Sequence, residues 1–298
     1  MKPLTLKSPA KINLYLDVIR KRSDGYHDIY TIFERINLFD TIRFSKRSRG
    51  NITVSSSGNR IPQNGANIAY QAAQLLKEHF SISDGIRIHI QKRIPVAAGL
   101  GGGSSNAACV FEGLNRFWRL GLTQKRIQRL AERIGSDVPF FTLKSSFALG
   151  KGRGEQLKKI SKLNPLWHIL IVPKIALSAK AIYTALDRKK SPKKGKATKM
   201  LTKSRKSANM LTYALRKHNL TLAHKYVMNT LEEPAARLCP SISKIKETMA
   251  CHGVKTYALS GSGPAVFGLV NSRKEAEALK SKIQRTHKSW QVFAVRTY

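Results

Sequence analysis

Hydrophobic and polar residues alternate along two long runs near the start of the chain. Residues 4–19 and 29–45 are rich in β-branched side chains and follow a period of two, which predicts a pair of antiparallel strands. The sequence Ser23-Asp24-Gly25 between them is a strong turn signal. Apolar residues then recur three or four positions apart over 67–80, and an alternating run covers 86–90. We therefore expect a hairpin followed by a helix and a strand.

A glycine cluster at 99–103 separates these elements from two further predicted helices, at 105–118 and 123–134. Beyond the glycine-rich turn at 150–154, the pattern changes to short apolar strands and amphipathic helices. Their order matches a split βαβ or ferredoxin-like unit with helices inserted. The predicted elements lie at 168–172, 178–187, 242–249, 255–260, 264–270, 273–286 and 290–296.

These two patterns predict an α+β protein with two domains, residues 1–160 and 161–298. A chain of 298 residues is long enough for two domains of ordinary size. It also buries enough surface to be stable without disulfides. Nothing in the sequence ties the last strand, residues 290–298, to the second domain, so its return to the first domain stays open.

The charge balance of the chain is unusual. It has 54 Lys and Arg against 17 Asp and Glu, a formal net charge of +37, while its 42% hydrophobic and 24% charged residues are ordinary. This charge favours phosphorylated ligands, polyanions or acidic membrane surfaces, without choosing among them. The three cysteines form no CxxC pair. No apolar run approaches the roughly 18 residues of a spanning helix, so we expect a soluble, cytosolic protein without a membrane partner.

Residues 188–206 carry ten Lys and Arg and no acid, interleaved with Ser, Gly and Pro. This composition predicts a mobile, solvated loop. Nucleic-acid contact through the segment is the alternative, because a run of cations attracts polyanions. The chain has neither the RNP aromatic motif nor zinc-finger spacing, which counts against a nucleic-acid-binding protein.

The strongest local signal for chemistry is the segment 95–108, in which four of the five residues at 99–103 are glycine and Ser104 and Ser105 follow. Glycines let backbone N–H groups approach an anion closely, and a helix N-terminus adds its own free N–H groups. The segment therefore predicts a phosphate cradle, with either serine available to a phosphate oxygen or Mg²⁺. The alternative is a flexible loop with a serine N-cap. The segment is neither a Walker A motif nor a GxGxxG dinucleotide motif.

Three further segments carry candidate chemical groups. On the first strand, Lys11 and Asn13 share one face and can meet an anion and a hydroxyl, or they form an ordinary solvated face. Asp137 is a candidate general base, or a helix N-cap ahead of Pro139. The Ser-Gly-Ser-Gly turn at 260–263 is either a hairpin turn or a second backbone nest for phosphate.

Taken in order, these segments resemble the GHMP kinase superfamily. The glycine loop is shared across the superfamily, including kinases of other small molecules. The first strand and the Gly-Tyr-His sequence narrow the resemblance to a member whose substrate is a cytidine diphosphate ester of methylerythritol. The matching residues are Pro9-Ala-Lys11-Ile-Asn13-Leu, Gly25-Tyr26-His27, 95–108, Gly135-Ser-Asp137-Val-Pro139 and Ser260-Gly-Ser-Gly263.

The resemblance implies a two-domain fold, with an N-terminal domain like domain 2 of ribosomal protein S5 and a ferredoxin-like C-terminal domain. It implies transfer of the γ-phosphoryl group of ATP, with Mg²⁺, to the 2-hydroxyl of the methylerythritol unit in isoprenoid biosynthesis. Asp137 matches the family's base, and Lys11 matches its partner beside the reacting hydroxyl. Tyr26 and His27 match residues that hold the cytosine. The other implied contacts are Asn13 and Tyr183 for the substrate, and Asn67, Pro95, Val96, Ala97, Ala98, Gly99, Leu100, Gly101, Gly102, Gly103, Ser104 and Ser105 for ATP.

Two positions depart from the family pattern. Ala179 stands where the family usually carries Thr near the substrate, and Ala265 replaces a common Thr after the Ser-Gly-Ser-Gly turn. Either change could weaken a hydrogen bond, but neither removes a proposed catalytic group. The basic segment 188–206 is also more extreme than the resemblance leads us to expect.

Overall fold

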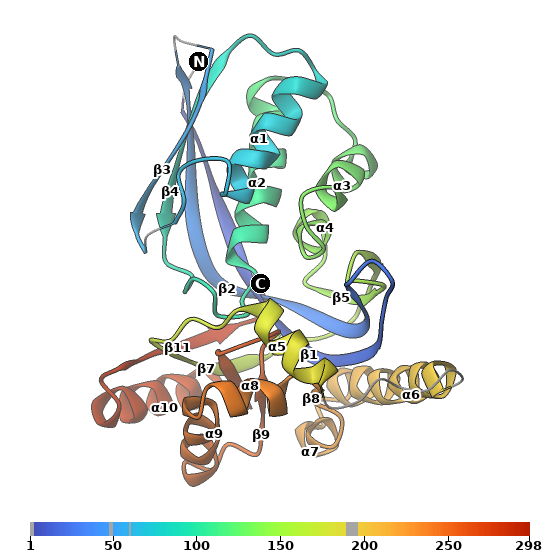
Figure 1. Ribbon diagram of the computed structural model, residues 1–298. Coiled ribbons are helices and arrows are strands. Elements are labelled where there is room, and N and C mark those ends of the chain that lie inside the picture. The colour runs from blue at the N-terminus through green and yellow to red at the C-terminus, as the bar shows by residue number, and fades with distance from the viewer. Residues whose placement is uncertain (1–2, 48–49, 60, 189–195) are drawn as a thin grey trace. The chain divides into compact units, whose positions relative to one another are not determined.

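The computed structural model describes residues 3–47, 50–59, 61–188 and 196–298 as a chain of mixed α and β structure (Figure 1). The chain forms two compact units. The first comprises residues 1–10, 38–96 and 101–144, and the second comprises 11–37, 97–100 and 145–298. The polypeptide therefore crosses between the units several times. The division into domains 1–160 and 161–298 stays a prediction.

The first unit is built on the second half of strand β2 (His27–Arg47). Strand β4 (Gly85–Lys92) pairs antiparallel with that half of β2 and parallel with β3 (Ile52–Gly58). Helices α1 (Ile68–His79) and α2 (Gly102–Phe117) lie side by side in this unit (Figure 1). Helices α3 (Gln124–Glu132) and α4 (Val138–Thr142) follow α2.

The close packing in the first unit depends on one glycine. A Cβ atom on Gly113 of α2 would lie 2.4 Å from the ring of Phe44 on β2, closer than real Cβ contacts. The helix can therefore approach this ring only because residue 113 has no side chain. Phe44 is fully buried, and so are Ile86, Ile88 and Ile90, which alternate inward along β4.

The second unit contains a four-stranded antiparallel sheet in the order β11-β7-β10-β9. Its strands are β7 (Trp167–Pro173), β9 (Thr256–Leu259), β10 (Val266–Val270) and β11 (Trp290–Arg296). Numbered along the chain, this order is 4-1-3-2, and the predicted ferredoxin-like arrangement is confirmed. Because β11 pairs with β7 along its whole length, the last strand completes this sheet.

The other strands of the second unit extend β1 (Leu4–Lys21) and β2. Strand β5 (Phe147–Lys151) pairs with β2 and with β6 (Gln156–Lys159), and β8 (Met228–Asn229) runs parallel to β1. One buried apolar cluster of this unit includes Ile169, Ile182 and Ile245. The accompanying helices are α5 (Ala179–Asp187), α7 (Leu220–His224), α8 (Glu232–Leu238), α9 (Ser241–Cys251) and α10 (Arg273–Thr286).

The predicted loop at 188–206 is wrong over its second half, because helix α6 (Lys196–Arg216) begins there. Three apolar residues of the helix that follow the basic run, Ala208, Leu211 and Leu215, are buried. Within the basic run, Ser204 donates a hydrogen bond to Asp17 of β1. Lys and Arg are good helix formers, so an anchored apolar face is enough to extend the helix back through them. Residues 189–195 lie outside the described residues.

None of the helices in the described ranges combines the length and the apolar character that crossing a membrane requires. The cytosolic location inferred from the sequence stays a prediction.

Candidate active site

A buried row of polar side chains lies on β1 and β2 within the second unit. Lys11 is 4% exposed, and its Nζ donates to Oδ1 of Asn13 at 2.6 Å. Asn13 Nδ2 donates to Oγ1 of Thr31 at 2.8 Å, and this hydroxyl donates to the carbonyl of Tyr15. The predicted shared face of Lys11 and Asn13 is confirmed, but the solvated alternative is wrong, because the row is buried. An ammonium held in a low-dielectric site attracts a bound anion strongly, so this lysine is suited to contact an anionic ligand.

Two other titratable groups lie further along the same strand. Burial first, and the charge of Asp17 second, raise the pKa of Tyr15 to about 12. Burial also raises the pKa of Asp17, whose Oδ2 accepts hydrogen bonds from Ser204 and Tyr15. Tyr15 therefore stays protonated near neutral pH and is a poor candidate for the catalytic base.

The middle of the glycine loop, residues 97–100, packs against the Ser-Gly-Ser-Gly turn within the second unit. Ala265 N donates to Ala98 O at 3.2 Å, and Ser260 Oγ donates to Gly99 O at 3.1 Å. A Cβ atom on Gly99, where φ is +75°, would lie 2.0 Å from the carbonyl oxygen of Ser260. The glycine is therefore required for this close approach. Ala265 makes this contact through its main-chain N–H. The contact therefore needs no threonine side chain at this position.

The same turn also lies beside the buried lysine. A Cβ atom on Gly261 would be 3.2 Å from Nζ of Lys11 and 3.3 Å from Oδ1 of Asn13. Lys11 N donates to Leu100 O at 3.0 Å, so β1 contacts the glycine loop as well. Three of the segments singled out in the sequence, the first strand, the loop and the turn, thus come together in one unit.

Asn229 of β8 supports this turn and was missed in the sequence. Its Nδ2 donates to the carbonyls of Leu259 and Gly261 at 2.8 and 2.7 Å, and its Oδ1 accepts from Leu231 N at 2.9 Å. An isolated Asn in a helix-rich stretch gives no signal for this role. It acts only because β8 pairs with β1.

The end of the glycine loop forms the start of α2 in the first unit. Gly101 occupies the N-cap with φ +66° and no side-chain cap, and the helix begins at Gly102, three residues before the prediction. The serine N-cap alternative is therefore wrong. Gly101 has no side chain that could cap the first N–H groups of α2, which favours an anion there. Ser105 is buried and accepts a hydrogen bond from Ser8 at 2.7 Å, whereas Ser104 is only half-buried.

A buried acid, Asp40 of β2, hydrogen-bonds within the first unit to residues 92–94, which precede the glycine loop, and to Asn106, which follows it. Its carboxylate accepts from Nζ of Lys92 at 2.6 Å, from Arg93 N and Ile94 N at 2.8 and 2.9 Å, and from Nδ2 of Asn106 at 2.9 Å. Burial lowers the pKa of Lys92, and Asp40 opposes that effect. Asp40 is fully buried. The only sequence signal was an acid inside an apolar strand pattern, more than 50 residues from the loop.

Replacing Asp40 by Ala should destabilise the first unit strongly, because it leaves the Lys92 ammonium buried without a counter-charge. We expect a loss of about 3–5 kcal/mol in the free energy of unfolding, measured by urea denaturation of the full chain. Asp84→Ala removes a partly exposed partner of Lys46, 3.5 Å away, and should cost less than about 1 kcal/mol. Equal losses in the two variants would contradict a structural role for the buried pair.

Asp137 and Asn67 both lie at helix starts in the first unit. Asp137 occupies the N-cap position of α4, is partly buried and makes no capping hydrogen bond with its side chain. The N-cap alternative thus holds for its position but not for its side chain. Asn67 does cap α1, accepting from Ala69 N at 2.9 Å, and its Nδ2 donates to Pro62 O. Its predicted nucleotide contact stays a prediction.

The residues expected to hold a base lie in the second unit. The rings of His27 and Tyr183 stack with centroids 4.7 Å apart, and Tyr26 is 54% exposed with the Arg153 guanidinium 5.0 Å from its ring centroid. His27 Nε2 lies 2.7 Å from Oδ1 of Asp187. The structure thus brings His27 and Tyr183 together across more than 150 residues of chain, and their contact with a base stays a prediction.

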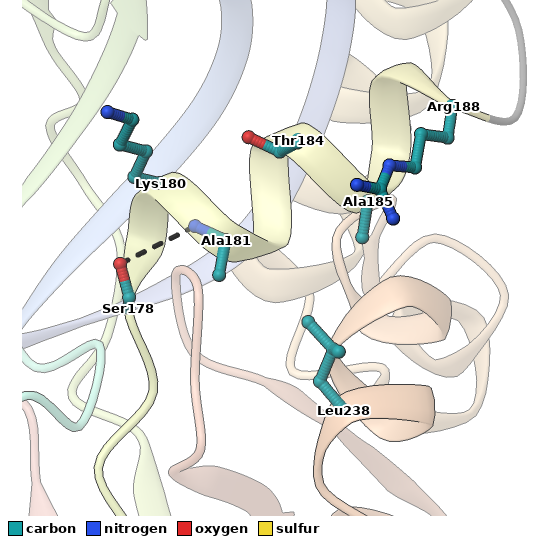
Figure 2. A pocket seen from close by; sticks show the side chains of 7 residues that line it. All are labelled: Ser178, Lys180, Ala181, Thr184, Ala185, Arg188 and Leu238. Carbon is teal, nitrogen blue, oxygen red and sulfur yellow. Dashed lines mark hydrogen bonds between the residues drawn. The ribbon is translucent and has the colours of Figure 1, made fainter.

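A pocket of about 400 Å³ lies along the same helix, α5, but is lined by other residues (Figure 2). Neither Tyr183 nor His27 contributes to its lining, and Ser178 at its edge caps α5 by accepting from Ala181 N at 3.4 Å. Its residues are Ser178, Lys180, Ala181, Thr184, Ala185, Arg188 and Leu238. None of the site residues predicted from the sequence lines this pocket.

Groups of three or more His, Cys, Asp or Glu side chains able to hold a metal ion are absent from the described part of the chain. Mg²⁺ is commonly held by phosphate oxygens and few protein groups. The half-buried hydroxyl of Ser104, in the first turn of α2, fits such a minor role better than Ser105, which is bonded to Ser8.

Comparison with known protein families defines the class of protein. The model of the GHMP kinases N terminal domain matches residues 67–145, and that of the GHMP kinases C terminal matches 211–289. The fold, with its two sheets and its glycine loop at the start of α2, is that of the two-domain GHMP kinases.

Individual relatives narrow the class further. The chain is 40% identical to the 4-diphosphocytidyl-2-C-methyl-D-erythritol kinase of Shouchella clausii, over 99% of this chain and 92% of the relative. Its identity to the enzyme of that name from Alkaliphilus metalliredigens is also 40%, over 100% and 98%. A crystal structure of 4-(cytidine 5′-diphospho)-2C-methyl-D-erythritol kinase is 30% identical, with a TM-score of 0.79 over 99% of this chain and 100% of that one. The chain belongs to the 4-diphosphocytidyl-2-C-methyl-D-erythritol kinase family.

Proposed function

We propose that the protein transfers the γ-phosphoryl group of ATP to the 2-hydroxyl of 4-diphosphocytidyl-2-C-methyl-D-erythritol, a step of isoprenoid biosynthesis. The observation that carries this proposal is the convergence of Lys11 and Asn13 with the glycine loop and the 260–263 turn in the second unit. Phosphoryl transfer depends on positioning and charge stabilisation more than on covalent chemistry. A buried cation beside two backbone turns supplies both.

We assign the chemical roles to Asp137 and Lys11. Asp137 accepts the proton of the attacking hydroxyl, and Lys11 stabilises the negative charge that develops on that oxygen. Asn13 holds Nζ of Lys11 through its Oδ1 at 2.6 Å, and is itself held by Thr31. The ammonium is thereby placed before the reaction begins, so little reorganisation is needed in the transition state.

ATP binds, in this proposal, at the glycine loop. Its triphosphate lies on backbone N–H groups of residues 97–103 and on the uncapped start of α2. Val96, which is 46% exposed, offers an apolar surface next to the loop. When bound, Mg²⁺ neutralises charge on the phosphate oxygens, and Ser104 is the residue we assign to it.

The cytidine end of the substrate binds at Tyr26, His27 and Tyr183. Tyr183 and His27 already stack at 4.7 Å, which limits their side-chain freedom before binding and lowers the entropy cost of holding a base. The exposed ring of Tyr26 is available to stack on the base or to contact its ribose.

The proposal is tested by measuring ATP consumption with each candidate alcohol. We expect turnover with 4-diphosphocytidyl-2-C-methyl-D-erythritol and little with mevalonate or homoserine. A polynucleotide arm of the same experiment tests nucleic-acid contact through α6, whose Lys203, Arg205 and Lys206 are exposed, and binding by that route should weaken steeply with salt. Comparable turnover of all three alcohols would contradict the proposed substrate.

Replacing Gly101 by Val should weaken ATP binding while leaving the affinity for the alcohol substrate close to wild type. The side chain would stand at the N-cap of α2, where φ is +66°, beside the N–H groups that we assign to the triphosphate. Isothermal titration with each ligand separates the two affinities. Gly121→Val is a matched control, because φ is +64° there and no atom lies within 4 Å of the added Cβ. An equal loss of affinity for both ligands in a folded Gly101→Val protein would point to a purely structural role for the glycine loop.

A further inference from the structure

His27, the first residue of β2, is held by two residues of α5. Its Nε2 lies 2.7 Å from Oδ1 of Asp187, the last residue of α5, and its ring stacks at 27° on Tyr183, one helical turn earlier on α5. The His27 side chain is 7% exposed, so these contacts leave the ring little freedom to turn. Among the described residues, none is seen to hydrogen-bond the other ring nitrogen, Nδ1.

Asp187 can act only as an acceptor toward this ring. Its second oxygen, Oδ2, accepts from Nζ of Lys21 at 2.7 Å. Burial raises the pKa of Asp187, but the hydrogen bonds from Lys21 and His27 outweigh burial and bring this pKa below its ordinary value. An ionised carboxylate has no proton to donate. The N–H of a neutral His27 must therefore lie on Nε2, and Nδ1 presents a lone pair.

This tautomer has a consequence for base recognition. An acceptor at Nδ1 can bind the exocyclic amino group of cytosine, whereas uracil in the same pose presents a carbonyl oxygen whose lone pairs oppose that of Nδ1. We propose that Asp187 is a positioning residue that sets the tautomer of His27 and thereby makes the site select a pyrimidine with an amino group over its keto counterpart. The inference rests on the proposed function, in which His27 contacts the cytosine.

The sharpest test is Asp187→Asn, because the variant side chain has both a donor and an acceptor. The Lys21 ammonium can only donate, so the Asn carbonyl should stay with Lys21 and the amide N–H groups should face Nε2 of His27. Nε2 must then accept, and the proton moves to Nδ1. We expect kcat/KM for the cytidine substrate to fall roughly 10- to 100-fold. The kcat/KM for the uridine analogue should stay level or rise, because the uracil carbonyl can accept a hydrogen bond from Nδ1–H, and kcat at saturation should change little.

A second variant distinguishes this mechanism from general damage. In Asp187→Asn combined with Lys21→Met, the amide is free to turn its carbonyl toward His27, which restores the wild-type tautomer. We expect the preference for cytidine to recover in this double variant, and to stay near wild type in Lys21→Met alone. Asp28→Asn is the control for loss of a nearby carboxylate, since Asp28 follows His27 directly but pairs with Arg20 and Arg22.

The tautomer itself can be measured without substrate, from the ¹⁵N chemical shifts and couplings of the His27 ring. We expect the Nε2–H form in the wild type and the Nδ1–H form in Asp187→Asn. An unchanged tautomer in Asp187→Asn, or an equal fall in the two kcat/KM values without recovery in the double variant, would overturn the inference. A wild-type protein inactive on both substrates would instead refute the proposed function, and the NMR result would still decide the role of Asp187.

Discussion

Asp137→Asn should lower kcat by roughly 10²–10⁴, the range typical of a lost general base, with ATP affinity nearly unchanged. Asn keeps the size of the side chain at the N-cap position of α4, where Asp137 makes no capping hydrogen bond. The helix start therefore loses no contact of that kind, and the change acts on proton transfer. Single-turnover phosphorylation and ATP titration measure the two quantities separately.

Asp84→Asn provides the comparison for loss of one negative charge, since Asp84 lies in the same unit and is about half exposed. This variant should retain wild-type kcat. Full activity of Asp137→Asn would falsify the catalytic assignment. If Asp137→Asn also lowered the thermal stability of the protein, its loss of activity would be explained by impaired folding.

Lys11→Met should lower kcat by roughly 10²–10³, the effect of removing one preorganised group that stabilises charge in a transition state. Met has a similar length and apolar stem, and the site is 4% exposed. Because Nζ of Lys11 lies 5.5 Å from the ring centroid of Phe33, a Met side chain should largely keep the packing beside this ring. The ammonium, which we propose stabilises the developing alkoxide, is lost. Its charge is needed most when that alkoxide forms, so the loss falls on kcat more than on KM.

Lys7→Met is the natural control, because Lys7 lies on the same strand but is exposed, 5.3 Å from the ring centroid of Phe39. It should leave both kinetic parameters unchanged. A rise in KM alone for Lys11→Met would reduce Lys11 to a binding residue. Asn13→Ala should also lower kcat, but by less than Lys11→Met. The ammonium of Lys11 stays in place and loses only its hydrogen bond to Asn13, 2.6 Å long.

Local patterns in the sequence predicted most of the elements, because each depends on short-range periodicity. Helix α10 lies at the predicted residues 273–286, and the order of strands and helices after residue 167 was sufficient for the ferredoxin-like arrangement. The sequence placed the start of α2 three residues too late, because glycines lower helix propensity. The hydrogen bonds of Asp40 beside the glycine loop were not predicted, because they join residues that are distant in the chain.

The sequence by itself determined which chemical groups are present and their order along the chain: a lysine and an asparagine two residues apart on a strand, a glycine loop, an acid before Pro139 and a Ser-Gly-Ser-Gly turn. These are properties of adjacent residues and need no knowledge of long-range contacts. Only the tertiary structure decided that Lys11 is buried against Gly261, that Asn229 supports this turn, and that Asp187 holds His27. Such contacts join residues up to 250 positions apart, and burial, which turns a solvated polar face into a reactive one, is a property of the packed chain alone.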